Sequence, residues 1–139
     1  GLETVGLRMK QHCSNAEKVI TFLETQKKVK NVIYPTNHQG EIKERAKKYL
    51  SGGNGALVGV DLGTVEAGAK FIDNLKMLYH VANIGDARSL AIHPASTTHS
   101  QLSPEEQLAA GVTPGYVRLS IGIEHSDDII ADIKQALAA

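Results

Sequence analysis

The sequence has one cysteine, no excess of charge and no long hydrophobic run. Because Cys13 stands alone, the chain cannot form a disulfide with itself, and a reducing, cytoplasmic environment is expected. The 15 basic residues balance the 15 acidic ones, so neither a nucleic acid nor an anionic membrane surface is an expected partner. The apolar stretches are too short to cross a bilayer, and the polar residues 1–10 are unlike a signal peptide.

Helix-like and strand-like patterns alternate along the chain, with proline or glycine at most boundaries. Apolar residues at helical spacing predict one long amphipathic helix from about Glu3 to Thr25, with Val5, Leu7 and Met9 among its apolar positions. Other helices are expected over residues 41–50, 64–75 and 103–110 and from 126 onward, and strands over 31–34, 56–62, 78–81, 89–93 and 116–121. This order predicts an α+β fold (α/β-like) with a small, mostly antiparallel sheet that helices cover on one face.

The predicted strand over residues 116–121 carries one arginine, Arg118, in a mostly apolar run. A guanidinium in such a strand is costly unless an anion meets it, and its planar fork of donors suits a carboxylate. The strand by itself leaves three explanations open. Arg118 pairs with an Asp or Glu of its own chain, lies on the solvated face of an edge strand, or binds the carboxylate of a ligand.

Three motifs surround this arginine: Asn-Ile-Gly-Asp-Ala-Arg-Ser-Leu at 83–90, His-Pro-Ala-Ser-Thr-Thr-His-Ser at 93–100 and Val-Arg-Leu-Ser-Ile-Gly-Ile-Glu at 117–124. Together they resemble the Cys/Met-metabolism family of pyridoxal-phosphate enzymes, and most of all its O-acetylhomoserine sulfhydrylase branch. The resemblance runs over essentially the whole chain. It implies the fold of the C-terminal domain of fold-type I pyridoxal-phosphate enzymes.

The same resemblance implies that Arg118 binds the α-carboxylate of the substrate, with Asn83 and Thr98 close to it. From the residues alone, Asn83 is also explained as a turn residue, and Thr98 as a hydroxyl that bonds the loop backbone. The family's cofactor-binding lysine has no counterpart here, because Ala67 replaces the serine of its Ser-x-x-Lys motif and Lys70 lies within a predicted helix. No catalytic, cofactor-binding or metal-binding residue is therefore expected in this chain.

By this resemblance, residues 1–139 form a single domain at the C-terminal end of a longer enzyme, with 1–28 a long linking helix and 29–139 the domain that orients the substrate carboxylate. The full-length enzyme is expected to use pyridoxal 5'-phosphate to replace the acetate of O-acetylhomoserine by sulfide or a thiol. This step of methionine biosynthesis gives homocysteine or methionine. The chain alone is expected to be inactive and to bind no cofactor. Its expected partners are N-terminal domains of the same enzyme and further copies in a homo-oligomer.

The sequence departs from the lyase branch of the family at Ala82-Asn83, where relatives carry Glu-Ser. The missing carboxylate favours a sulfhydrylase over a cystathionine synthase or lyase, which is kept as an alternative. Two other classes stay open from the residues. One is a stand-alone regulatory α+β domain that binds a small carboxylate through Arg118, and the other is a structural interaction domain in which Arg118 is paired internally.

Three further features indicate structure and not chemistry. His93 and His99 have no cysteine partner and no helical spacing for zinc, so they are expected to brace a loop through hydrogen bonds. The glycine-rich residues 52–55 lack the Lys-Ser/Thr ending of a phosphate loop and precede a strand, which predicts a turn. Cys13 lies in a helical pattern and is expected to serve packing.

Overall fold

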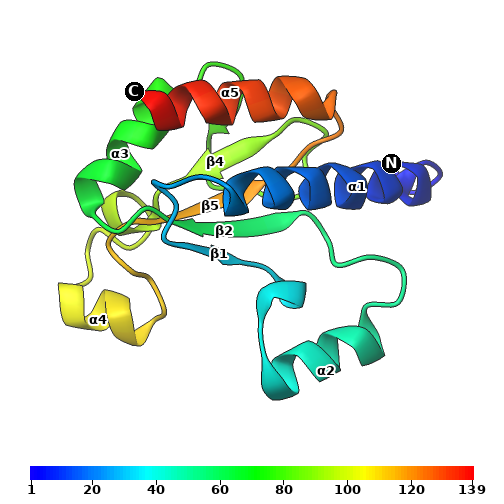
Figure 1. Ribbon diagram of the computed structural model, residues 1–139, viewed down its shortest axis with the longest axis horizontal. Coiled ribbons are helices and arrows are strands. Elements are labelled where there is room, and N and C mark those ends of the chain that lie inside the picture. The colour runs from blue at the N-terminus through cyan, green and yellow to red at the C-terminus, as the bar shows by residue number, and fades with distance from the viewer.

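A five-stranded sheet lies at the centre of the computed structural model, which describes all residues from 1 to 139 (Figure 1). The strands are β1 (Asn31–Ile33), β2 (Leu57–Asp61), β3 (Tyr79–His80), β4 (Leu90–Ile92) and β5 (Tyr116–Ser120), and their spatial order is β1-β2-β5-β4-β3. All neighbouring pairs are antiparallel except β3 and β4, which run parallel. The predicted α+β fold with a small, mostly antiparallel sheet is confirmed.

Three helices cover one face of this sheet: α1 (Val5–Glu24), α3 (Val65–Asn74) and α5 (Ser126–Ala138). Two further helices, α2 (Gly40–Tyr49) and α4 (Pro104–Ala109), lie on the other side of the sheet in Figure 1. None of the five helices combines the length and the apolar character that crossing a membrane requires.

Side-chain caps fix the starts of α3 and α4. The Thr64 hydroxyl accepts the N–H of Ala67 at 3.1 Å and caps α3, and Ser103 and Glu106 form a reciprocal capping box at the start of α4. The structure adds one element between the predicted strand over residues 31–34 and the predicted helix over 41–50. A 3₁₀ turn occupies Pro35–Asn37, because the proline ring fixes a helical φ and needs no N–H partner, and α2 already begins at Gly40.

The core fills the space between the sheet and the three covering helices. Val117 and Leu119 of β5 are fully buried, and their partners in register on β2 are Val60 and Val58. Side chains alternate along a strand, so these residues share one face and pack beneath α1 and α5. From the helices, the core receives the fully buried Val19, Leu23, Ile129 and Ile133.

The first half of α1 differs from the sequence prediction, because its apolar residues are exposed. Val5, Leu7 and Met9 are 41%, 72% and 42% exposed, although their spacing predicts an apolar side that packs on the sheet. Figure 1 shows the reason, because α1 extends past the end of the sheet at its N-terminal side. Only its second half joins the core. The division into a linking helix over 1–28 and a domain over 29–139 stays a prediction.

Asp132 ties α5 to the segment that leads into β3. Its carboxylate accepts the backbone N–H groups of Lys76, Met77 and Leu78 at 2.9, 2.8 and 3.0 Å, and a fourth bond comes from Gln135 Nε2 at 3.0 Å. Burial by itself raises the pKa of this carboxyl. The four hydrogen bonds outweigh that effect and hold the pKa of Asp132 below its ordinary value.

We expect Asp132→Asn to lower the free energy of unfolding by about 2–3 kcal/mol at neutral pH, because an amide cannot accept all four bonds. Since the pKa is lower in the folded state, the stabilisation by Asp132 is complete above the unfolded pKa and is lost as the pH falls through the folded pKa. Urea unfolding of parent and variant should therefore give a gap that narrows between about pH 7 and about pH 3.

Asp128→Asn is the matched control for this measurement, because Asp128 lies on the same helix and is exposed. It should change the free energy of unfolding by no more than about 0.5 kcal/mol. An Asp132→Asn variant as stable as this control would contradict the anchoring role of Asp132.

Candidate functional site

Arg118 lies at the middle of β5, in a row of residues that crosses the sheet. Its partners in register are Gly59 of β2 and Ile92 of β4, and Ile33 of β1 continues the row. Because Val117 and Leu119 point into the core, Arg118 points to the opposite face of the sheet. The edge-strand explanation of this arginine is wrong, since β5 is the central strand.

No carboxylate of the chain pairs with Arg118. The five ion pairs within residues 1–139 all join other groups. The half-buried Arg118 side chain has one hydrogen bond, from Nη2 to the backbone carbonyl of Asn83 at 3.4 Å. The explanation by an internal salt bridge is therefore wrong, and the structural interaction domain that rested on it loses its support. Most donors of the guanidinium fork have no partner in the chain.

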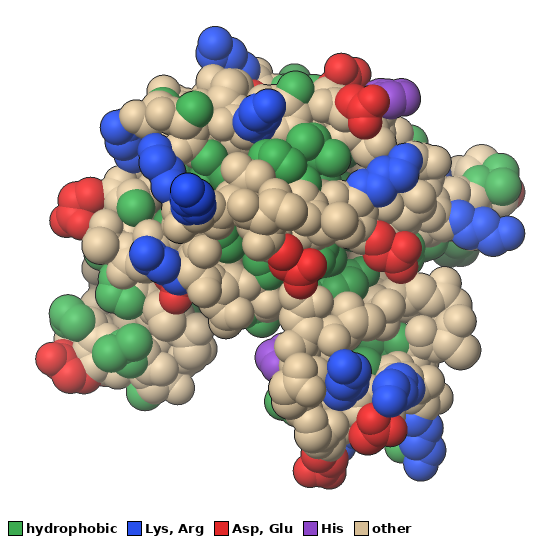
Figure 2. Space-filling model, in the orientation of Figure 1, with side chains coloured by type: hydrophobic (Ala, Val, Ile, Leu, Met, Phe, Trp, Pro, Cys, Tyr) green, Lys and Arg blue, Asp and Glu red, His purple; other side chains and the backbone are tan.

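A hollow of about 500 Å³ opens beside Arg118, between the sheet and α2. Its walls are mostly apolar, with Ile33, Ile42 and Leu57 among the lining side chains, and none of the lining residues is Asp or Glu. Figure 2 shows the surface indented on the side of the sheet that lies away from α1 and α5, between the parts that carry α4 and α2. A small anion that enters this hollow meets a guanidinium without a competing carboxylate.

Tyr116 lies in the same hollow, and its ring packs over Gly59. A Cβ atom at position 59 would lie 2.6 Å from the ring carbon Cε2 of Tyr116, so only glycine leaves room for the ring. Burial raises the pKa of the Tyr116 phenol, while the positive charge of Arg118 acts in the opposite direction. The phenol therefore keeps its proton at neutral pH and supplies a hydroxyl to the hollow that also holds Arg118.

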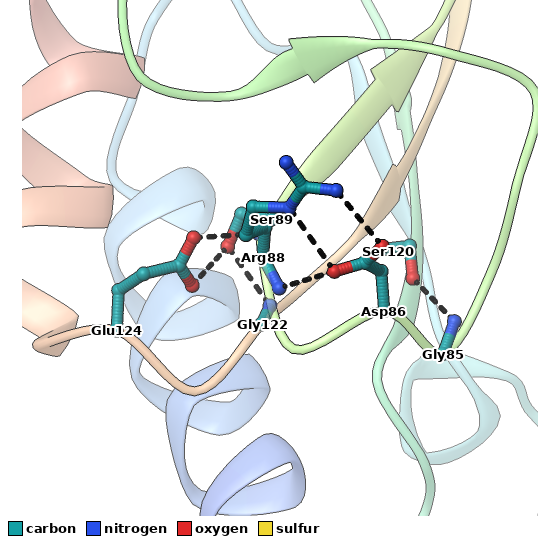
Figure 3. A network of polar contacts seen from close by, with 7 residues as sticks. All are labelled: Gly85, Asp86, Arg88, Ser89, Ser120, Gly122 and Glu124. Atoms are coloured by element: carbon teal, nitrogen blue, oxygen red, sulfur yellow. Dashed lines mark hydrogen bonds and ion pairs between the residues drawn. The ribbon is translucent and has the colours of Figure 1, made fainter.

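Asn83 lies near Arg118, as the sequence predicts, but the contact uses its backbone. The Asn83 amide oxygen accepts the N–H of Ile84 at 2.9 Å, which is the turn role that the residues alone also allow. The loop of residues 81–89 that carries Asn83 is bonded to β5 and to the segment after it (Figure 3). Whether the Asn83 side chain also contacts a substrate stays a prediction.

Thr98 follows the 3₁₀ turn at Pro94–Ser96 and is exposed. Its hydroxyl bonds His99 Nδ1 at 2.9 Å and makes no hydrogen bond to Arg118 or Asn83. The structure thus brings together two of the three predicted site residues. The place of Thr98 near the substrate carboxylate stays a prediction.

His93 and residues 52–55 take the structural positions that the sequence predicts. His93 is buried, donates from Nε2 to the carbonyl of Pro114 at 2.8 Å and bonds Ser96 Oγ through Nδ1 at 2.8 Å, so it braces the loop after β4. Residues 52–55 form the turn and loop between α2 and β2. Lys70 is exposed on α3, and no three metal-binding side chains of the chain converge on one point.

This fold is shared with a solved enzyme. The crystal structure of an O-acetylhomoserine (thiol)-lyase from Campylobacter jejuni, which carries a pyridoxyl-lysine phosphate at its position 205, superposes with a TM-score of 0.92 at 44% identity. The superposition covers 100% of this chain and 33% of that enzyme. The sheet with its central arginine is therefore a domain of a pyridoxal-phosphate enzyme fold.

The chain belongs to the Cys/Met metabolism PLP-dependent enzyme family, whose model matches residues 1–138. Among curated proteins, it is 52% identical to the O-acetyl-L-homoserine sulfhydrylase of Leptospira meyeri, over 99% of this chain and 31% of that protein. It is 44% identical to an L-methionine gamma-lyase of Fusobacterium nucleatum subsp. polymorphum, over 99% of this chain and 35% of that protein.

The chain thus spans about a third of the length of the relatives that it matches. The match begins at residue 1 of this chain and gives no support to the expected place at the C-terminal end of the relatives, which stays an untested prediction. The family is confirmed, and its members depend on pyridoxal phosphate.

Sequence reasoning missed three residues around Arg118: Tyr116, Ser120 and Glu124. All three lie in or next to the quoted motif at 117–124, but the sequence assigned them no role. The alternation of the strand was the available signal, because it places Tyr116 and Ser120 on the same face as Arg118. The partners of Glu124 come from a loop 35 residues earlier, which no local pattern reveals.

We expect Gly59→Ala to lower the free energy of unfolding by about 1–3 kcal/mol, because the new methyl group would overlap the Tyr116 ring and approach Ile33 Cβ to 3.0 Å. Urea unfolding monitored by circular dichroism measures the change. Gly6→Ala on α1, with nothing within 4 Å, is the control and should leave stability unchanged or raise it by up to about 1 kcal/mol. Equal stability of the two variants would show that the ring does not need the space at position 59.

Proposed function

We propose that this chain is part of a pyridoxal-phosphate-dependent O-acetylhomoserine sulfhydrylase and that Arg118 binds the α-carboxylate of the amino-acid substrate. The single observation that carries the proposal is the environment of Arg118. Its half-buried guanidinium lies on a central strand, beside a hollow without acidic lining, and has only the Asn83 carbonyl as a partner. A planar fork of donors in this setting favours a carboxylate held by two parallel hydrogen bonds.

The contribution of this chain to the reaction is orientation. A carboxylate held by Arg118 fixes one end of the substrate, and the mostly apolar walls of the hollow lie beside it. Thr98 and Asn83 are proposed to lie close to the same carboxylate. Holding one end of a flexible substrate in a fixed direction lowers the entropy cost of reaching the reactive arrangement.

The residues of this chain do not fit the covalent site of the cofactor, because no lysine among them is buried. We therefore assign that site to the rest of the enzyme. When bound there, pyridoxal phosphate supplies the electron sink that amino-acid chemistry at the γ-carbon requires. The chain by itself should be inactive.

The choice of a sulfhydrylase rests on Ala82. This exposed residue begins the loop beside Arg118 and offers no carboxylate or hydroxyl to a second amino-acid head. Sulfide and small thiols need no such partner, whereas cysteine does. Higher identity to the Leptospira sulfhydrylase than to the gamma-lyase supports the same choice.

We also propose that the rest of the enzyme, or a second copy of it, covers the first half of α1. Val5, Leu7 and Met9 expose apolar side chains along this segment, and so does Leu2 just before it. The relatives are about three times as long as this chain, so much of the enzyme's surface lies in the remainder. The expected contact with other domains of the enzyme would cover this surface within one chain, and the expected homo-oligomer would cover it with a second copy.

In the full-length enzyme, Arg118→Lys should lower kcat/KM for O-acetylhomoserine by about 30- to 1000-fold, or about 2–4 kcal/mol, because lysine cannot form the two parallel bonds. Arg118→Ala should lose more and keep the cofactor, which its absorbance monitors. Lys47→Ala, an exposed lysine of α2 that pairs with Glu44 and does not line the hollow, is the control and should change kcat/KM by less than about threefold. Parental kinetics of Arg118→Ala would refute the carboxylate role.

With O-acetylhomoserine and equal concentrations of sulfide and L-cysteine, homocysteine should be the main product. The reason is that Ala82 leaves the polar groups of cysteine without partners. Chromatographic separation of homocysteine from cystathionine gives the ratio, and Ala82→Glu should shift it toward cystathionine. Predominant cystathionine from the parent enzyme would overturn the sulfhydrylase choice and leave the role of Arg118 untouched.

A further inference from the structure

The loop of residues 81–89 is attached to β5 and its extension at four points, and the first of these points is Arg118 itself. Arg118 Nη2 donates to the carbonyl of Asn83, and the N–H of Gly85 donates to Ser120 Oγ at 3.2 Å. Arg118 and Ser120 lie two residues apart on one strand, so their side chains share a face. The loop therefore passes over the face of the sheet that carries the arginine.

The third attachment is a carboxylate clamp at the end of the loop. Glu124 accepts the backbone N–H of Ser89 at 2.6 Å with Oε1 and the Ser89 hydroxyl at 2.9 Å with Oε2. The same hydroxyl accepts the N–H of Gly122 at 2.8 Å. Figure 3 shows Glu124 reaching from the segment after β5 to Ser89, which is fully buried.

The geometry of this clamp requires a carboxylate. Because a carboxylate oxygen can only accept, the Ser89 hydroxyl donates its proton to Glu124, while the hydroxyl oxygen accepts from Gly122. The backbone N–H of Ser89 also needs an acceptor. A glutamine at position 124 offers one oxygen and one NH₂ group, so it can satisfy only one of these two donors.

The segment that carries Glu124 is itself fixed by α1. Asn15 Nδ2 donates to the carbonyls of Gly122 and Glu124 at 3.0 and 2.8 Å, and His12 Nδ1 donates to the carbonyl of Ile121 at 2.6 Å. Both side chains are buried. These bonds tie the segment that carries Glu124 to the buried side of α1, so the clamp connects the loop to the core of the domain.

The loop of residues 81–89 and the segment after β5 approach each other so closely that only glycine fits at position 122. A Cβ atom there would overlap the Glu124 carboxylate and the backbone of residues 87 and 88. The N–H of Ile123 also donates to the carbonyl of Ala87 at 2.8 Å. The end of the loop is thus held by both backbone and side-chain contacts within a small volume.

We infer that Glu124 is a positioning residue for Arg118: through Ser89 it fixes the loop of residues 81–89, and through the Asn83 carbonyl it fixes the direction of the guanidinium. The inference rests on the proposed carboxylate role of Arg118. Without the clamp, the loop shifts and the fork loses its alignment to the substrate carboxylate. The loss therefore concerns recognition of the carboxylate and not the rest of the substrate.

The test compares O-acetylhomoserine with its α-carboxamide in the full-length enzyme. The ratio of the two kcat/KM values measures recognition of the carboxylate. Glu124→Gln and Ser89→Ala should each lower this ratio by about tenfold, because a small misalignment of a bidentate contact costs about that much. Ser120→Ala, which removes the bond to Gly85, is a milder second variant should the others fail to fold. Glu66→Gln, an exposed glutamate on α3, is the control and should leave the ratio unchanged.

The same comparison can be made without turnover. Isothermal titration calorimetry of the full-length enzyme gives the dissociation constants of L-norleucine, which has a carboxylate, and of L-norleucinamide, which has none. The Glu124→Gln change should weaken binding of the acid and leave that of the amide unchanged. In an Arg118→Ala background, Glu124→Gln should not further lower the acid-to-amide preference, in either kcat/KM or binding, because Glu124 acts through the arginine.

Three results separate the possible failures. Equal loss with acid and amide, or an additive loss in the Arg118→Ala background, would overturn the positioning role of Glu124 and leave the role of Arg118 intact. A ratio unchanged by Arg118→Ala would overturn the proposed function and this inference together. Both the proposed function and this inference would be supported if Glu124→Gln lowers the acid-to-amide ratio in the parent enzyme but has no further effect on it in the Arg118→Ala background.

Discussion

The pairing of β5 with strands on both of its sides is the constraint on which the rest of the structure depends. Because β2 and β4 fix its register, the alternation of its side chains is fixed as well. Val117 and Leu119 are committed to the core, and Tyr116, Arg118 and Ser120 to the opposite face. One strand thereby contributes both to the stability of the domain and to a surface that can bind an anion.

Polar side chains set the positions of the segments that the sheet does not hold. Asp132 gathers three consecutive N–H groups before β3, Asn15 binds two carbonyls after β5, and Glu124 holds Ser89 at the end of the loop beside Arg118. Each of these groups is paired, and no buried side-chain nitrogen or oxygen lacks a hydrogen bond. Hydrogen bonds are directional and apolar contacts are not. Buried hydrogen-bonded groups of this kind therefore fix the position of a loop more specifically than apolar packing does.

The site itself combines a cation without a carboxylate partner and a hollow with mostly apolar walls. Gly59 makes room for the Tyr116 ring, and that ring borders the hollow in which Arg118 lies. The family of pyridoxal-phosphate enzymes to which the chain belongs acts on amino acids, whose common feature is a carboxylate next to an amino group. The chain spans about a third of its relatives, and the proposed function gives it the recognition of the carboxylate and assigns the cofactor chemistry to the remainder.

The sequence by itself determined the class of fold, the capped starts of α3 and α4, the strand of Arg118 and the family, because these depend on local pattern and on motifs written in order. It did not determine that the first half of α1 is exposed, since amphipathic spacing indicates an apolar side but not the length of the surface that covers it. Only the tertiary structure decided that β5 is central, that no carboxylate reaches Arg118, and that Glu124 meets Ser89. These features depend on contacts between residues tens of positions apart. Local sequence patterns do not indicate such contacts, because neither partner specifies the other in its own segment.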